Sequence, residues 1–194
     1  MKTSAAVRGV ALLTVMVIPL NAAADQSVEQ RVAQSRAVAQ SLMQALKSEL
    51  QGAMQAGGPV NAVAVCQTRA GGITEGQATA DGLRIRRTSL KVRNPANAPD
   101  AWEESVLRRL EIRKVAGEDI KTLEYHEVTE VDGNKIFRWM KAIPTAEVCL
   151  ACHGGDSVAP DVEAELVALY PQDQARGFAV GDIRGAFSVK QAVD

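Results

Sequence analysis

Residues 122–143 read TLEYHEVTEVDGNKIFRWMKAI, and this stretch decides much of the expected fold. Asp132-Gly133 is among the strongest short hairpin signals, because these residues readily adopt the backbone conformations that a tight two-residue turn needs. The segments on either side, about Thr122 to Val131 and Lys135 to Ile143, are rich in β-branched and aromatic residues, which favour strands. The stretch therefore predicts a pair of antiparallel strands.

Two helices are expected before this hairpin. Apolar residues recur at helical spacing from Ser27 until Gly57-Gly58 ends the pattern. Pro59 can begin a second, shorter helix, because the N–H that proline lacks is not needed at that position. We expect this second helix to carry Cys66 on its buried face and to end at Gly71-Gly72.

The remaining segments alternate between helical and extended patterns. The expected elements are an arginine-rich strand from Leu83 to Val92, an amphipathic helix with Trp102, Val106 and Leu110 on one stripe, a short helix capped by Thr145, a helix from about Asp161 to Tyr170, and a last strand from Gly177 to Val189 interrupted at Gly181 and Gly185. This order predicts an α+β fold, a small antiparallel sheet with a long N-terminal helix and helical insertions wrapped on one face.

Composition and charge limit the possible functions. The chain has 194 residues, which corresponds to one domain, and 46% of them are hydrophobic, enough to bury a core. The 22 basic and 23 acidic residues give a net charge of −1. No large basic surface is expected, and nucleic-acid binding is therefore not an expected function.

The first 24 residues are typical of an export signal. The basic residues Lys2 and Arg8 precede an apolar stretch, Val10 to Leu20. Ala22-Ala23-Ala24 after it fits a small-residue cleavage site. We expect cleavage after about Ala24, which leaves residues 25–194 as a single domain without a stable membrane span. In a bacterium this predicts a periplasmic location, with retention of the segment as an anchor as the alternative.

Cys149-Leu150-Ala151-Cys152-His153 matches the attachment pattern of c-type haem. Two thiols at this spacing lie on one side of a helical turn, where they can form thioether bonds to the vinyl groups of one haem, and the next residue can place an imidazole beneath the iron. A disulfide between the two cysteines is possible in an oxidising compartment. A thioredoxin-like redox pair expects a βαβ unit, and a zinc site that adds Cys66 expects a second closely spaced ligand pair. Since neither is evident, the motif predicts one covalently attached haem c with His153 as the proximal iron ligand.

The opposite face of the iron has few candidate ligands. His126 lies among polar neighbours on the expected hairpin, and Met43, Met54 and Met140 fit apolar stripes. Cys66 differs from these, because an unpaired thiol in an exported protein is exposed to oxidation unless it is buried or bound to a ligand. Cys66 is therefore either a buried, unreactive thiol or an iron ligand, and the residues alone do not decide between the two.

The arginine-rich strand also has two interpretations. Arg84, Arg86, Arg87, Lys91 and Arg93 crowd this strand and its exit. They are either the charges of a solvated edge strand or a source of contacts to the haem propionates, which guanidinium groups bind in a bidentate way. Arg87 and Arg93 are the candidates for such contacts.

Four motifs in order make the chain resemble a known family. They are Asn61 to Cys66, Arg86 to Pro95 with Asn97, Pro99, Asp100 and Trp102 after it, Cys149 to His153, and Gly181 to Ala186. From about Val28 to Val189 the chain is similar to the single-haem c-type cytochrome family with a PAS-like fold. That family was long catalogued as a domain of unknown function and resembles the extracellular sensing domains of some histidine kinases.

The resemblance implies a PAS-like sheet that holds one haem with His153 and Cys66 as axial ligands. It also implies redox or small-gas sensing through a change of ligation. Because the sequence contains no transmitter segment, such sensing is expected to need a partner protein. A single-haem electron carrier is the alternative, and an enzyme is less expected because only His126 could supply the usual acid-base imidazole. The long first helix offers a surface for a homodimer.

Overall fold

The computed structural model describes residues 26–78 and 82–193. The expected export signal, residues 1–24, and its cleavage after Ala24 lie outside these ranges. Within them, no helix combines the length and the apolar character needed to cross a bilayer.

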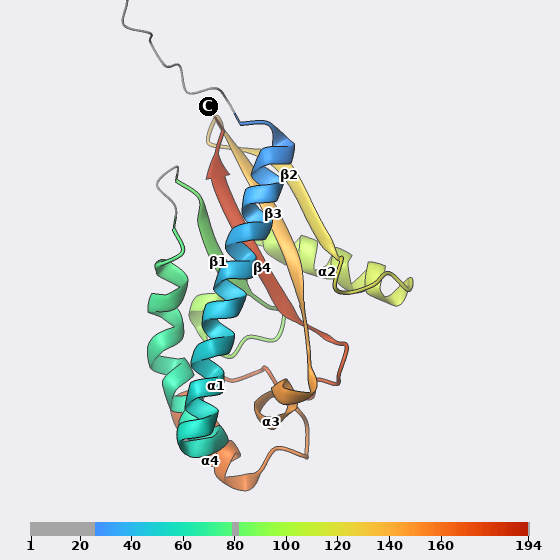
Figure 1. Cartoon of the computed structure of the whole chain (residues 1–194). Coiled ribbons are helices and arrows are strands. Elements are labelled where there is room, and N and C mark those ends of the chain that lie inside the picture. Colours follow the sequence, from blue (N-terminus) through green and yellow to red (C-terminus); the bar gives the residue numbers. More distant parts are fainter. Residues whose placement is uncertain (1–25, 79–81, 194) are drawn as a thin grey trace, which may run out of the picture.

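The described residues form one four-stranded antiparallel sheet beside a long N-terminal helix, which confirms the expected α+β class (Figure 1). The strands are β1 (Arg84–Thr88), β2 (Glu124–Val131), β3 (Asn134–Pro144) and β4 (Ile183–Ala192). Their order in the sheet is β1-β4-β3-β2. The last strand of the chain is therefore a central strand, and β1 is an edge strand.

The expected hairpin is confirmed as the pair β2 and β3. Val131 lies opposite Asn134, and the two residues between them have positive φ values, 52° at Asp132 and 77° at Gly133. These values are those of the tight hairpin turn that favours Asp-Gly. The local sequence was sufficient to predict the turn and the antiparallel pairing.

The long helix α1 (Val28–Glu75) consists of two parts that run side by side in opposite directions (Figure 1). Ser27 caps its start, and Gly57 and Gly58 leave the helical conformation between the parts. Glycine is suited to this kink because the φ of Gly58 is 69°. Pro59 begins the second part, as expected.

The second part of α1 does not end at Gly71-Gly72, and that expectation was wrong. The helix continues to Glu75. Ile73 packs against the core between α1 and the sheet, and the Thr74 hydroxyl donates to the carbonyl of Ala70. Ile73 is partly buried, and the contact offsets part of the cost of about 1 kcal/mol for each helical glycine.

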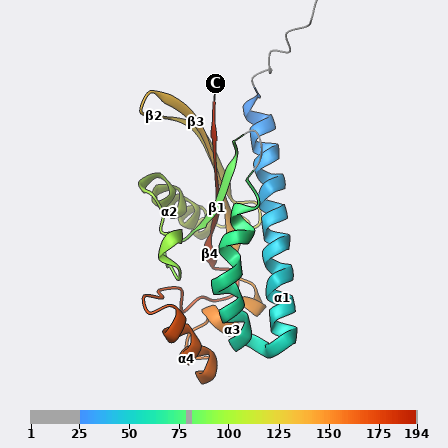
Figure 2. The same ribbon diagram turned by 90° about the vertical axis from the view of Figure 1, so that its left-hand side faces the viewer.

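Helices cover both faces of the sheet, so the expectation of helices on one face was also wrong (Figure 2). α1 lies on one face, where Phe137 and Trp139 of β3 are buried against it. α2 (Ala101–Val115) lies on the other face, where Met140 and Ala142 of β3 are buried. Because alternate residues of β3 point to opposite faces, each face of this strand supplies a separate core.

Two strands are shorter than expected. β1 ends at Thr88 instead of Val92, and β4 begins at Ile183 instead of Gly177. β4 then continues through Gly185, which lies directly against β1: a Cβ at this position would come within 2.3 Å of the Thr88 carbonyl oxygen. Only glycine allows this close approach of two backbones.

Asp100 connects α2 to the sheet. Its carboxylate caps the helix by accepting from the N–H of Glu103, and it also pairs with Arg138 at 2.7 Å and Lys190 at 3.2 Å. Burial alone would raise the pKa of this carboxyl, but the hydrogen bonds from Arg138 and the Glu103 N–H outweigh it and lower the pKa to about 2.

We expect Gly185→Ala to destabilise the protein by about 3 kcal/mol, because the contact is with backbone that cannot rotate away. Gly52→Ala is the matched control. Position 52 is exposed in α1 with no atom within 4 Å of an added Cβ, and alanine should stabilise the helix there by about 0.5–1 kcal/mol. Urea unfolding of the two variants measures both effects, and equal effects would contradict the close approach.

We expect Asp100→Asn, which keeps a capping oxygen but removes the charge, to destabilise the protein at neutral pH by about 1 kcal/mol after allowance for partial exposure. The folded pKa of about 2 lies below the ordinary 3.8, so this stabilisation is complete above about pH 5 and is lost as the pH falls toward 2. The difference between wild type and variant in urea unfolding should shrink over that range. A difference independent of pH would contradict the ion pairs.

Candidate functional site

The Cys149-to-His153 segment lies at the end of the molecule where α1 reverses (Figure 1). It forms a short 3-10 turn, η2 (Glu147–Cys149), followed by α3 (Leu150–His153). α3 contacts both α1 and α4 (Pro160–Leu169). Cys152 packs with Val63 of α1 and Leu166 of α4 in a small apolar cluster. The motif is therefore held between helices that come from opposite ends of the chain.

The ends of this helical segment differ in part from expectation. Gly154 ends α3, as expected, and its N–H donates to the Leu150 carbonyl. Thr145 does not cap the segment, so that expectation was wrong. Its backbone pairs instead with Gly181 and Asp182, and its hydroxyl has no partner among the residues described. These backbone contacts fix the entry of the motif to the start of β4.

The three cysteines of the chain, Cys66, Cys149 and Cys152, are all free thiols. No disulfide joins Cys149 to Cys152 in this structure. Across residues 26–78 and 82–193, no three side chains of the His, Cys, Asp and Glu types are grouped to hold a metal ion by themselves.

The His153 imidazole is oriented by one hydrogen bond. Its Nδ1 lies 2.9 Å from the carbonyl oxygen of Ala175, and because a carbonyl only accepts, Nδ1 carries the proton. Nε2 is then the nitrogen with a free lone pair. Burial lowers the pKa of His153 to about 3, and Arg184 and Arg93 add to this shift. The imidazole is consequently neutral at pH 7 and able to bind a metal through Nε2.

Arg93 connects the attachment segment to the loop that precedes β4. Its Nε donates to Asp173 at 3.0 Å, and its Nη2 donates to the carbonyls of Cys152 at 2.5 Å and Ala175 at 3.3 Å. The Arg93 and Asp173 side chains are only 12% and 4% exposed. This is a buried ion pair that joins the exit of β1 to α3 and to the loop before β4.

Cys66 lies close to the motif. It follows Val63 by one helical turn on the second part of α1, and Val63 shares the apolar cluster of Cys152. Burial raises the pKa of the Cys66 thiol, and the charges of Arg87 and Arg93 oppose this shift only in part. Burial also raises the pKa of Cys152, and Cys66 is near enough to add to that shift.

The arginines of β1 lie on opposite faces of the sheet, which the sequence alone did not predict. Arg86 points toward α2, where it pairs with Glu103 and donates to the carbonyls of Ala96 and Ala98. Arg87 is on the side of α1, like Ile85, and lies near Cys66. The Arg87 Nε is buried, and it has no hydrogen-bond partner among the residues described.

Arg184 is a site residue that the sequence analysis missed. It lies on β4, near His153 and Cys149, and its Nε is also buried without a partner in the described part of the chain. The motif Gly181 to Ala186 contains it, but no sequence signal gave the direction of its side chain. Two of the other ligand candidates lie elsewhere: His126 is opposite Trp139 in the hairpin, and Met140 is buried against α2.

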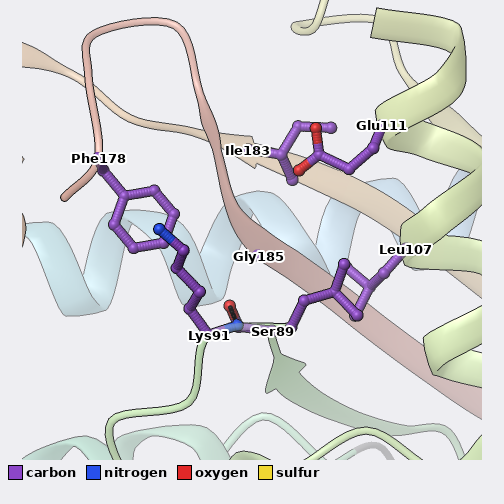
Figure 3. A pocket seen from close by; sticks show the side chains of 8 residues that line it. Ser89, Lys91, Leu107, Glu111, Phe178, Ile183 and Gly185 are labelled. Carbon is purple, nitrogen blue, oxygen red and sulfur yellow. Dashed lines mark hydrogen bonds between the residues drawn. The ribbon is translucent and has the colours of Figure 1, made fainter. Parts of the chain in front are cut away.

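A separate cavity of about 250 Å³ lies on the α2 side of β4 (Figure 3). Leu107 and Glu111 reach it from α2, and Phe178 and Lys91 close its opposite side. The Lys91 ammonium lies 4.9 Å from the centroid of the Phe178 ring. Phe178 thus separates this cavity from His153, whose ring it meets edge-on at 6.2 Å.

The α+β fold with its Cys-x-x-Cys-His segment defines a cytochrome-like domain. A family model described as Tll0287-like matches residues 21–192, and this chain belongs to the Tll0287-like family. The membership expected from the four sequence motifs is thereby confirmed.

Among solved structures, the crystal structure of the cyanobacterial haem protein Tll0287 is similar, with a TM-score of 0.59 and 24% sequence identity. The match covers 85% of this chain and 94% of that one. At this identity the likeness shows the fold. No curated protein matches the chain.

We expect Arg93→Gln to destabilise the protein by about 2 kcal/mol, because it removes one of the two arginine partners of the buried Asp173 carboxylate and leaves only Arg176. Arg108→Gln is the control, since Arg108 forms an exposed pair with Glu104 on α2 and its loss should cost less than about 0.5 kcal/mol. Urea unfolding measures both. Hydrogen exchange should also become faster at the Ala175 amide, which donates to Asp173.

Proposed function

We propose that this chain is a c-type haem protein in which Cys149 and Cys152 hold one haem covalently and His153 binds the iron. The hydrogen bond from His153 Nδ1 to the Ala175 carbonyl carries the proposal. Iron-binding histidines usually donate their other ring nitrogen to a fixed acceptor in this way, which sets the tautomer and the ring orientation. The neutral state of His153, which follows from its lowered pKa, leaves Nε2 available at pH 7.

Other features of the site fit the same group. Both motif cysteines are free thiols on one short helical segment, as thioether formation requires. The buried, unpartnered Nε of Arg87 fits a carboxylate, and haem carries two of them. Bound haem would supply a redox-active iron and a position for a small ligand. The expected PAS-like architecture belongs to this proposal, supported by an antiparallel sheet in which the first and last strands are neighbours.

We infer that Cys66 would supply the second iron ligand, because its helix packs against the attachment segment. Burial raises the pKa of this thiol, so the unbound side chain is protonated at neutral pH. Cys66 would therefore have to lose this proton in order to serve as an iron ligand. A ligand of this kind is held less firmly than one that stays deprotonated on its own.

The proposed role is a redox or small-gas sensor in the periplasm that acts through a partner protein. Cys66 lies on the second part of α1, which the kink at Gly57 and Gly58 separates from the first part. Gain or loss of the Cys66 ligand therefore acts on a helical segment with its own hinge. This segment is the element through which a change at the site would reach the surface of the domain.

We expect the haem-loaded ferric protein to show a low-spin EPR signal typical of thiolate ligation, and Cys66→Ala to abolish it. On reduction, the absorption spectrum of the wild type should show loss or exchange of the thiolate. His126→Ala is the control and should leave both spectra unchanged, because His126 lies in the hairpin. Mass spectrometry of the intact chain establishes covalent attachment, which should be absent from the Cys149→Ser, Cys152→Ser double variant.

Two outcomes would contradict parts of this proposal. If Cys66→Ala has wild-type spectra, Cys66 is a buried thiol and the sensor role fails. If the thiolate signature is kept in both oxidation states, the protein is better described as an electron carrier.

A further inference from the structure

Arg184 is the extra residue of a β-bulge in β4. Gly185 lies opposite Ile143 of β3, whereas Ile183 lies opposite the next residue of β3, Pro144. Two steps along β4 therefore correspond to one step along β3. A bulge of this kind interrupts the alternation of side chains and re-aims one of them, and bulges are common beside functional sites.

The effect of the bulge is visible at Ile183. Strict alternation would place residues 183 and 186 on opposite faces, yet Ile183 and Ala186 pack in the same cluster on the α2 side. Arg184 is thereby released from that side. It lies instead near His153, whose pKa its charge lowers, and near Cys149.

The contacts of the Arg184 side chain hold it in place but supply no negative charge. The guanidinium lies 5.2 Å from the centroid of the Phe178 ring, the same ring that meets His153. Its Nη1 donates to the Ser89 hydroxyl at 3.3 Å and to the Lys91 carbonyl at 3.4 Å. Figure 3 shows Phe178 and Lys91 together beside β4. These three partners, the Phe178 ring, the Ser89 hydroxyl and the Lys91 carbonyl, are all neutral groups.

Arg184 has no carboxylate partner in the part of the chain that the structure describes. Asp173 is the acid close enough to influence it, but Asp173 is already paired with Arg93 and Arg176. Arg87 and Arg93 place further positive charge nearby, and with burial they lower the pKa of Arg184 to about 10, which still leaves it charged at pH 7. A buried cation without a counter-ion raises the free energy of the folded state, and a bound anion would remove this cost.

We propose that Arg184 binds a propionate carboxylate of the haem, acting with Arg87 from the neighbouring strand. This inference rests on the proposed function. Both arginines have a buried Nε without an acceptor, so each can present a guanidinium edge to a carboxylate. Arg93 differs from them, because Asp173 and two carbonyls already occupy its guanidinium.

This contact has an electronic consequence. Arg184 places a positive charge beside His153 and neutralises a negative group close to the iron, and both effects favour the reduced state. Removal of the charge should therefore lower the midpoint potential. A residue that served only to fill space would not change the potential in this direction.

The test uses haem-loaded wild type, Arg184→Gln, Arg184→Lys and the surface control Arg108→Gln. The midpoint potential is measured by spectroelectrochemical titration, and the propionate bending band by resonance Raman spectroscopy. We expect Arg184→Gln to lower the potential and shift the band. We expect Arg184→Lys to keep the potential closer to that of the wild type but to shift the band, because lysine keeps the charge and loses the bidentate contact. Arg108→Gln should change neither.

The outcomes separate this inference from the proposed function. Wild type without covalent haem would overturn both. Attached haem with a wild-type potential and band in Arg184→Gln would overturn the role of Arg184 alone. If Arg184→Gln does not retain haem, Arg184→Lys decides the matter: a shifted band supports the contact, and an unchanged band overturns it.

Discussion

The buried ion pair between Arg93 and Asp173 is the contact on which the candidate site depends. Asp173 holds Arg93 through one carboxylate oxygen and accepts the N–H of Ala175 through the other. The carbonyl of the same Ala175 then orients His153. The direction of the imidazole is thus determined by a chain of contacts that begins at the exit of an edge strand. Two backbone bonds from Gly177 and Phe178 to the end of the motif hold the loop in place beside it.

Features encoded by neighbouring residues could be predicted from the sequence. The turn at Asp132-Gly133, the start of the second helix part at Pro59 and the end of α3 at Gly154 all depend on residues within a few positions of each other. The spacing of the cysteine pair and its histidine is local as well. For these features, backbone preference and tertiary packing favour the same conformation.

Features that depend on distant contacts could not be predicted. The helix continues past Gly71-Gly72 because Ile73 reaches a core built mainly from the sheet. Arg93 finds its carboxylate partner 80 residues away in the sequence. The direction of Arg184 depends on a bulge that exists only when β3 and β4 are paired, and alternation within β4 alone would have placed this side chain on the wrong face.

The central position of β4 has a consequence for how the chain folds. β4 pairs with both β1 and β3, although it is the last strand of the sequence, so the sheet cannot close until nearly all of the chain is available. Pairings between strands so far apart in sequence make folding slow. The cysteine segment precedes β4, and its supporting loop leads directly into that strand. The loop cannot pack behind His153 until β4 docks, so the proposed haem would be joined to the two thiols while this side of the site is still open.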